Sequence, residues 1–387
     1  MRILLVCPAV PQPPSHGASR LVASPLLDHL GERHAFAVVA AAAPGDSAAA
    51  HTWLASAAAP VEIVPAHRMR HPLSGRPAEG LRVLAAAVRR ASAVFRPDVV
   101  HLEGALLAPL AQVTGVPCVL VCHGAHVAGA RGSGRYKRLR ARLDERHESG
   151  WAREWFGAVT ARVVECEDDR RISSAHVPLE QIEVIPGGLD IERYAYRRIG
   201  HPSRLVFTGD VSSPSELEAA HRLATSILPL VRTRVPRAEL LIAATGDAEA
   251  AQSLGRLEGV RVESRLGDLR PSVWGAGVYV SALAGGSGAG HASRLLEAFA
   301  LGTPVVASAA SLARLDDVVP GQHVLGAADD ADLADAVSLL IREPIVATTL
   351  ARNARALVEQ CRTWRTIVRR YDDLYQRLGQ PPMEKAA

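Results

Sequence analysis

Short, uninterrupted apolar runs alternate with helical patterns along the first half of this chain. The runs lie at residues 2–7, 35–43, 61–66, 98–104, 117–124, 161–166 and 182–186. Apolar-periodic helical segments lie between several of them, for example at residues 81–95. Buried strands that alternate with helices are typical of a parallel sheet with helices on both faces. This half therefore predicts an α/β domain with a doubly wound parallel sheet.

The same pattern begins again after residues 200–203. Further strands are expected at residues 204–209, 238–246, 260–267, 278–283 and 304–308. With 387 residues, of which 48% are apolar, the chain is long enough for two such domains. We predict a first Rossmann-like domain at 1–199, a second at 200–360, and a C-terminal helix with a tail at 361–387 that packs back towards the first domain. Because open α/β sheets bind ligands beyond the carboxyl ends of their strands, the two domains are expected to face each other across a cleft.

The charge pattern argues against a nucleic-acid partner. The formal net charge is +4, with acidic and basic residues interspersed, and the main basic run at residues 135–142 has no ladder of aromatic residues beside it. The simplest interpretation of this run is a solvated helix face, and the alternatives are an acidic acceptor or a membrane surface.

The N-terminus and the cysteines indicate a cytoplasmic protein. The first apolar run is too short for a signal peptide, and no apolar stretch is long enough to span a bilayer, so we expect at most peripheral membrane association. The five cysteines are scattered, with neither a Cys-x-x-Cys pair nor a zinc-type spacing. Cys7, Cys118 and Cys122 lie in apolar runs, where thiols act as small hydrophobic side chains. Abundant alanine and arginine are typical of a high-GC bacterium.

The most informative segment is residues 281–308, which predicts a strand, a glycine-rich loop, a helix, a turn and a second strand. Gly285, Gly286, Ser287 and Gly290 belong to the loop, where missing side chains let backbone N–H groups approach a ligand. The following helix directs the positive end of its dipole at this loop, which favours phosphate.

Two charged residues follow on this helix. Arg294 and Glu297 are three residues apart and therefore share a face. A guanidinium is a fixed fork of donors that suits diphosphate oxygens, and a carboxylate can accept hydrogen bonds from the two hydroxyls of a ribose. One face thus offers both halves of a nucleoside diphosphate, although a surface ion pair on an ordinary helix is the alternative.

The stretch 296–308, Leu-Glu-Ala-Phe-Ala-Leu-Gly-Thr-Pro-Val-Val-Ala-Ser, resembles the donor-site motif of retaining GT-B glycosyltransferases, the group 1 and family 4-like transferases. Residues 184–190, 205–209 and 268–271 are similar to further family segments. The resemblance implies a GT-B fold and transfer of a sugar from a nucleotide diphospho-sugar to an acceptor hydroxyl, with retention, without a metal, and with no cofactor besides the donor itself. The donor-binding residues that it implies are Gly17, Gly209, Gly285, Gly286, Ser287, Gly290, Ser293, Arg294 and Glu297.

Two departures from the family pattern indicate a divergent subgroup. Most members have a second glutamate eight residues before the ribose-binding one, and here Ala289 stands in that position. The first strand of the second domain usually precedes an arginine–lysine pair, whereas here it leads into the segment 210–216, Asp-Val-Ser-Ser-Pro-Ser-Glu. We infer that Arg294 takes over the diphosphate charge from the missing pair.

In the first domain, the resemblance implies that Gly17 packs close to the donor phosphates, although a plain turn glycine is the alternative. It also implies that His123, which ends a strand, contacts the donor sugar or the acceptor. As a neutral imidazole His123 could take the acceptor proton, and a structural histidine is the rival interpretation. Glu103 is a second candidate catalytic residue, as an acceptor contact or base, or it is a capping carboxylate. His126 lies close by in sequence, but no metal-ligand spacing supports a metal site.

The sequence therefore predicts a sugar transferase that acts on a small-molecule, glycan or lipid-linked acceptor in cell-surface polysaccharide or secondary-metabolite biosynthesis. Two other functions stay open. The missing glutamate at Ala289 is compatible with a non-catalytic nucleotide-sugar-binding subunit, and some proteins of this fold epimerise nucleotide sugars.

Overall fold

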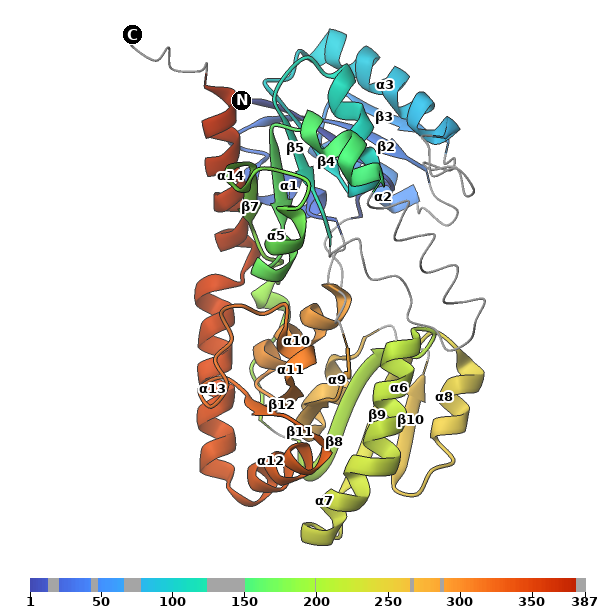
Figure 1. Ribbon diagram of the computed structural model, residues 1–387, viewed down its shortest axis with the longest axis vertical. Coiled ribbons are helices and arrows are strands. Elements are labelled where there is room, and N and C mark those ends of the chain that lie inside the picture. Colours follow the sequence, from blue (N-terminus) through green and yellow to red (C-terminus); the bar gives the residue numbers. More distant parts are fainter. Residues whose placement is uncertain are drawn as a thin grey trace. The chain divides into compact units, whose positions relative to one another are not determined.

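The computed structural model describes residues 1–12, 21–42, 48–65, 78–123, 150–198, 200–264, 268–285 and 289–380. These residues form two compact units (Figure 1). The first unit contains the described residues up to 187 together with helix α14 (Trp364–Gly379), and the second contains those of 188–363. The basic run at 135–142 lies outside the described residues.

The first unit is built on a seven-stranded sheet in which every neighbouring pair of strands is parallel. Each of the seven apolar runs predicted as a strand contributes one strand. The order reverses between β1 and β4, and such a switch point is where open α/β sheets bind ligands. In spatial order the strands are β3 (Val61–Val64), β2 (Ala35–Ala41), β1 (Arg2–Cys7), β4 (Val99–Glu103), β5 (Cys118–Val121), β6 (Ala161–Val164) and β7 (Ile182–Val184).

Helices cover both faces of this sheet. Successive residues of a strand point to opposite faces, so the buried strands pack against helices on both sides. Ile3 and Leu5 pack in one core with residues of α1, α2 and α14, and Leu4 and Val6 pack in the other with α3. The helices are α1 (Ala23–Leu30), α2 (Ala48–Ala57), α3 (Glu79–Phe95), α5 (Glu167–Ser173) and α14, with 3₁₀ helices at Ala105–Val113, Phe156–Ala158 and Leu179–Gln181.

The second unit repeats this plan with a six-stranded sheet, again parallel throughout. Its switch point lies between β8 and β11. The strands are, in spatial order, β10 (Val260–Ser264), β9 (Glu239–Thr245), β8 (His201–Asp210), β11 (Ala276–Ser281), β12 (Val305–Ser308) and β13 (Leu325–Ala327). The predicted α/β class with two doubly wound parallel sheets is confirmed.

Helices also cover both faces of the second sheet. Phe207 packs in a core with α6, α7, α8 and α12, whereas Val206 packs on the opposite face with α9, α10 and α13. The helices are α6 (Pro214–Arg222), α7 (Leu228–Arg234), α8 (Ala248–Leu254), α9 (Arg270–Trp274), α10 (Ala289–Leu301), α11 (Ala309–Leu312), α12 (Asp330–Arg342) and α13 (Pro344–Cys361), with a π-helical turn at Leu223–Ile227 and a 3₁₀ turn at Ile191–Arg193.

The structure divides the chain earlier than residues 199/200. Leu189 and Tyr194 are buried in the core of the second unit, and the Trp274 indole donates a hydrogen bond of 3.0 Å to the Ala195 carbonyl. Residues 188–198 therefore belong with the second sheet. At the other end of the chain, α14 packs against α1 and β4 of the first unit (Figure 1).

Three further features of the fold concern the strand β13, the buried cysteines and the length of the helices. The short strand β13 was not predicted, because its three residues include a glycine and show no apolar run. Cys7, Cys118 and Cys122 are buried and free, as their apolar surroundings predict. Among the described helices, none combines the length and the apolar character that crossing a membrane requires.

Candidate functional site

The carboxyl edge of the second sheet holds the predicted donor loop. β8 ends at Asp210 and β11 ends at Ser281, and the chain returns from β11 into α10 at this same edge. A side-chain carbon built on Gly285 would meet no atom of the described residues within 4 Å. Gly290 lies in the first turn of α10. The predicted loop residues Gly286 and Ser287 lie outside the described residues.

Arg294 is held by a carboxylate that the sequence did not assign to the site. Its guanidinium Nη2 donates to Oε1 of Glu216 in the first turn of α6, and the side chains are 18% and 12% exposed. The other Glu216 oxygen, Oε2, accepts the Asp210 backbone N–H. Arg294 Nη1 lies 4.0 Å from where a side-chain carbon on Gly290 would sit, and the buried Nε has no hydrogen-bond partner among the described residues. The guanidinium therefore points back along α10 towards the donor loop with donors to spare.

Gly209 makes room for this ion pair. A side-chain carbon at Gly209 would lie 2.7 Å from the Phe207 ring and 3.1 Å from Glu216 Oε2. The structure thus gives Gly209 a packing role beside Glu216.

The predicted ribose contact, Glu297, lies one turn after Arg294 and is half-buried, as is Ser293. Arg270 at the start of α9 lies in the electrostatic field of Glu297. Its pKa is raised first by its hydrogen bonds to Asp268 and also by the charge of Glu297. Arg270 and Asp268 belong to the segment 268–271, and Glu297 belongs to the segment 296–308. Two segments singled out from the sequence therefore interact through these charges.

A buried polar cluster, which the sequence did not reveal, ties the end of β11 to the start of α10. His291 Nε2 lies 2.7 Å from the Ser281 hydroxyl, and that hydroxyl donates to Ser311 Oγ at 2.7 Å. Since the Ser281 proton goes to Ser311, the ring nitrogen Nε2 carries its own proton and donates it to Ser281. Burial first, and then the charge of Arg294, lower the pKa of His291 to about 3, so its ring is neutral at physiological pH.

The first unit also has a carboxylate at the switch point of its sheet, at the end of β4. Glu103 is fully buried. Its carboxylate accepts the backbone N–H groups of Val22, at 2.9 Å, and Ala23, at 3.1 Å, at the amino end of α1. Burial opposes the ionisation of Glu103, but hydrogen bonds from His101 and His123 outweigh it and hold its pKa well below the usual range. The sequence left Glu103 open as an acceptor contact or base, or as a capping carboxylate, and its hydrogen bonds at the amino end of α1 favour the capping role.

His123 lies between two carboxylates. Its Nε2 donates to Glu103 Oε1, and its Nδ1 lies 3.0 Å from Glu165 Oε1, just beyond β6. Both ring nitrogens face carboxylates, so both carry protons and the ring is an imidazolium. Burial disfavours that charge, but Glu103 and Glu165 raise the pKa of His123 to about 10. These contacts favour the imidazolium over the neutral imidazole that was expected to take the acceptor proton, and the role of His123 stays a prediction. The His123 and Glu165 side chains are 24% and 20% exposed, so this pair is the part of the cluster that solvent reaches.

Two further residues singled out from the sequence, Gly17 and His126, lie outside the described residues. Across the part of the chain that the structure describes, no group of three His, Cys, Asp or Glu side chains is arranged to hold a metal ion.

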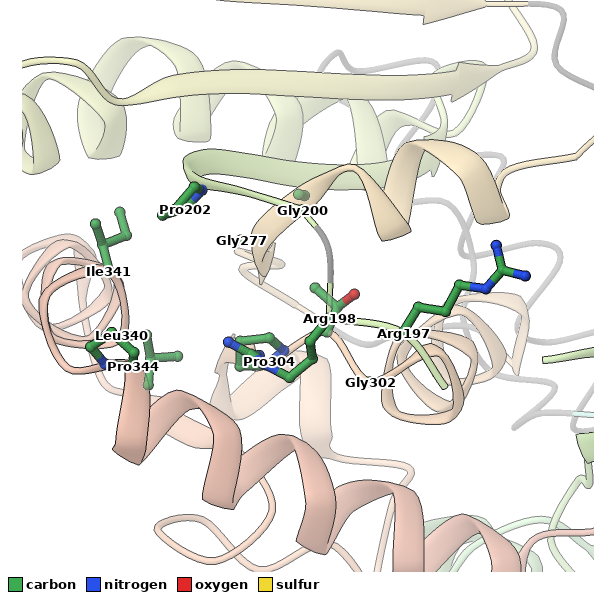
Figure 2. A pocket seen from close by; sticks show the side chains of 12 residues that line it. Arg197, Arg198, Gly200, Pro202, Gly277, Gly302, Pro304, Leu340, Ile341 and Pro344 are labelled. Atoms are coloured by element: carbon green, nitrogen blue, oxygen red, sulfur yellow. The ribbon is translucent and has the colours of Figure 1, made fainter. Parts of the chain in front are cut away.

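One cavity of about 110 Å³ lies in the second unit, at the amino ends of its strands (Figure 2). It is lined by the starts of β8 and β11, the turn before β12 and the amino end of α13. Arg197 belongs to its rim, but the side chain points away in Figure 2 and stacks over the Trp274 ring at 4.8 Å. Because this cavity lies at the opposite end of the strands from Arg294, it is separate from the donor loop.

Two family models match separate parts of the chain. The model described as Glycosyltransferase Family 4 matches residues 17–193, and the model described as Glycosyl transferases group 1 matches residues 202–343. No curated protein matches the chain in a sequence comparison.

Solved structures match both units together. Sucrose-phosphate synthase from Thermosynechococcus elongatus is similar with a TM-score of 0.67 at 16% identity, over 98% of this chain and 99% of that one. Anabaena HepE in complex with UDP and glucose is similar with a TM-score of 0.64 at 15% identity, over 97% and 100%. WaaG, a glycosyltransferase involved in lipopolysaccharide biosynthesis, gives 0.65 at 15% identity, over 96% and 99%.

The fold is therefore GT-B, with two Rossmann-like domains, as the sequence predicted. The two family models, which match separate parts of the chain, both describe glycosyltransferases.

Proposed function

We propose that this protein transfers a sugar from a nucleotide diphospho-sugar to an acceptor hydroxyl, with retention of configuration and without a metal. The observation that carries the proposal is the carboxyl edge of the second sheet. There, Arg294 points back towards Gly290, and the loop that contains Gly285 precedes the positive end of α10. Backbone amides, a helix end and a guanidinium together suit the two phosphates of a leaving nucleoside diphosphate. The positive charges of Arg294 and of the helix end would take the place of a metal ion beside the diphosphate. The nucleotide diphospho-sugar is the only co-substrate.

A uridine diphospho-sugar is the first donor to test. Structures of the similar Anabaena HepE are in complex with UDP, with UDP and glucose, and with UDP-glucose. In this chain Glu297 would accept hydrogen bonds from the two ribose hydroxyls. Ala289 offers no carboxylate to the transferred sugar, so the loop amides would have to hold the sugar without one.

The first unit supplies the candidate acceptor residues. His123 and Glu165 form its solvent-reached pair, and Glu165 can accept a hydrogen bond from a hydroxyl of the acceptor or the sugar. Because His123 is already protonated, the proton of the acceptor hydroxyl would pass to the departing diphosphate oxygen as the new bond forms on the same face. The acceptor is a small molecule, a glycan or a lipid-linked sugar, and the process is cytoplasmic assembly of a cell-surface polysaccharide or a secondary metabolite.

The test is a turnover assay with the purified chain, a panel of nucleotide diphospho-sugars and a panel of acceptor hydroxyls. Release of nucleoside diphosphate that depends on the acceptor, with an α-configured donor giving an α-linked product, would support the proposal. A product of inverted configuration would overturn the retaining part alone.

Two other outcomes correspond to the alternatives. Tight nucleotide-sugar binding without turnover on any acceptor would indicate a binding subunit, which the alanine at 289 favours. A new nucleotide-sugar isomer in the absence of acceptor would indicate an epimerase. Metal independence is checked by repeating the assay with a chelator, which should leave the rate unchanged.

A further inference from the structure

The C-terminal helix α14 contributes a fully buried tyrosine to the cluster around Glu103. The Tyr375 hydroxyl lies 2.6 Å from His101 Nδ1, and both side chains are 0% exposed. On the other side of the ring, His101 Nε2 lies 3.0 Å from Glu103 Oε2. Glu103 in turn accepts a hydrogen bond from His123 through its second oxygen. Four side chains from α14, β4 and the end of β5 are thereby connected in a single chain.

The direction of each hydrogen bond in this chain follows from the partners. An ionised Glu103 only accepts, so His101 Nε2 carries a proton and donates it. Burial, and then the charge of Glu103, raise the pKa of Tyr375 well above its usual value, so the hydroxyl keeps its proton. Among the described residues His101 is the hydrogen-bond partner of this hydroxyl, so the buried O–H satisfies its donor there. His101 Nδ1 therefore accepts, and this fixes the neutral tautomer of the ring.

We propose that Tyr375 is a positioning residue, which acts through His101 to fix the orientation and charge of Glu103 and thereby the placement of His123. The proposal deepens the function proposed above and rests on it for the role of His123. A donor on Nδ1 polarises the imidazole and strengthens the hydrogen bond from Nε2–H to Glu103. His101 then shares the carboxylate charge with His123. Without the tyrosine hydroxyl, Nδ1 is a buried acceptor without a donor, and more of the Glu103 charge falls on His123.

The molecule provides a matched control one turn earlier on the same helix. Tyr371 is 1% exposed, and its ring lies 6.0 Å from the His101 ring, compared with 6.1 Å for Tyr375. Within the described residues, no hydrogen bond joins Tyr371 to His101 or Glu103. Tyr371→Phe therefore removes a buried hydroxyl from α14 without cutting the chain, whereas Tyr375→Phe cuts it.

The experiment records the ring N–H proton resonances of His123 by NMR at neutral pH in the full-length protein, with the signals assigned by their loss in His123→Gln. In Tyr375→Phe the resonance of the proton shared with Glu103 should move downfield, because that hydrogen bond becomes stronger. In Tyr371→Phe it should stay at its wild-type position. Equal shifts in both variants, or no shift in either, would overturn the proposal, since a packing role of α14 affects both alike.

Kinetics provide the second readout. If His123 has the role proposed, Tyr375→Phe should lower kcat about tenfold with the donor KM unchanged, while Tyr371→Phe keeps both. An unchanged kcat together with a shifted resonance would contradict the function assigned to His123 and leave the positioning intact. Should Tyr375→Phe not fold, His101→Phe keeps a ring but removes both nitrogens that connect Tyr375 to Glu103, and the same downfield shift is expected of it.

Discussion

Each unit has a carboxylate near the switch point of its sheet, fully buried at Glu103 and half-buried at Glu216, and the two have different partners. In the second unit Glu216, just after β8, holds Arg294. In the first unit Glu103, at the end of β4, holds His123 and His101. Both carboxylates also accept backbone N–H groups, from Asp210 in one unit and from Val22 and Ala23 in the other. The shared element is a carboxylate anchored to the backbone that orients a cation.

The two units differ in whether the charge of that cation is permanent. An arginine stays charged at every pH at which the protein is folded, which suits a site for phosphate. A histidine is charged only because its neighbours make it so, and it can be altered through any one of them. The second unit therefore provides a fixed charge and the first provides a tunable one. The predictions below test this contrast from the largest expected effect to the smallest.

Arg294→Ala should cause the largest loss. Removing the guanidinium takes away a preorganised donor to the leaving diphosphate, and kcat should fall about 100- to 1000-fold. Arg294→Lys should recover part of the loss as a point charge without the fork of donors. Arg352→Ala on the exposed face of α13 is the matched control and should keep wild-type rates. Equal turnover of Arg294→Ala and the control would remove Arg294 from the donor site.

Glu103→Gln should have the second largest effect, and on stability. The amide keeps the shape but loses the charge that pairs with the His123 imidazolium and accepts hydrogen bonds from His101 and the amino end of α1. Removing one partner of a buried ion pair costs about 3 kcal/mol of unfolding free energy. Urea unfolding of the variant and the wild type measures this loss of unfolding free energy. Asp98→Asn, on an exposed ion pair with Arg2, should change stability by less than about 1 kcal/mol.

The same contrast shows how far the sequence could predict the site. The strands, and the placement of Arg294 and Glu297 on one helix face, follow from local periodicity. The partner of Arg294 does not, because Glu216 lies 78 residues away. Likewise Glu165 lies 42 residues from His123, and Tyr375 lies 274 residues from His101. Only the strand order brings these residues together, and no local pattern encodes it. His123 was therefore recognised as a candidate, whereas the two carboxylates that set its charge were not recognised as its partners.

Glu216→Gln should have a smaller effect than the loss of Arg294. The guanidinium remains, but the carboxylate that orients it is gone, so transition-state stabilisation should weaken by about one hydrogen bond to a charged group, or roughly tenfold in kcat/KM. If Glu216→Gln raised the rate instead, whereas Arg294→Ala lowered it, Glu216 would compete with the diphosphate for the guanidinium. Arg294 would then have to leave Glu216 when the donor binds.

The smallest effects concern pH, and they should have opposite signs in the two units. The pKa of His123 is raised to about 10, so its contribution to stability is complete below the unfolded value of about 6.5 and is lost as the pH rises towards 10. The pKa of His291 is lowered to about 3, so its contribution is complete above about 6.5 and is lost as the pH falls towards 3. Urea unfolding at a series of pH values should therefore show that His123→Gln flattens the alkaline limb and His291→Phe flattens the acid limb. If the two variants flattened the same limb, the charge states assigned to these rings would be wrong, and with them the distinction between a tunable cation in the first unit and a neutral ring beside a fixed cation in the second.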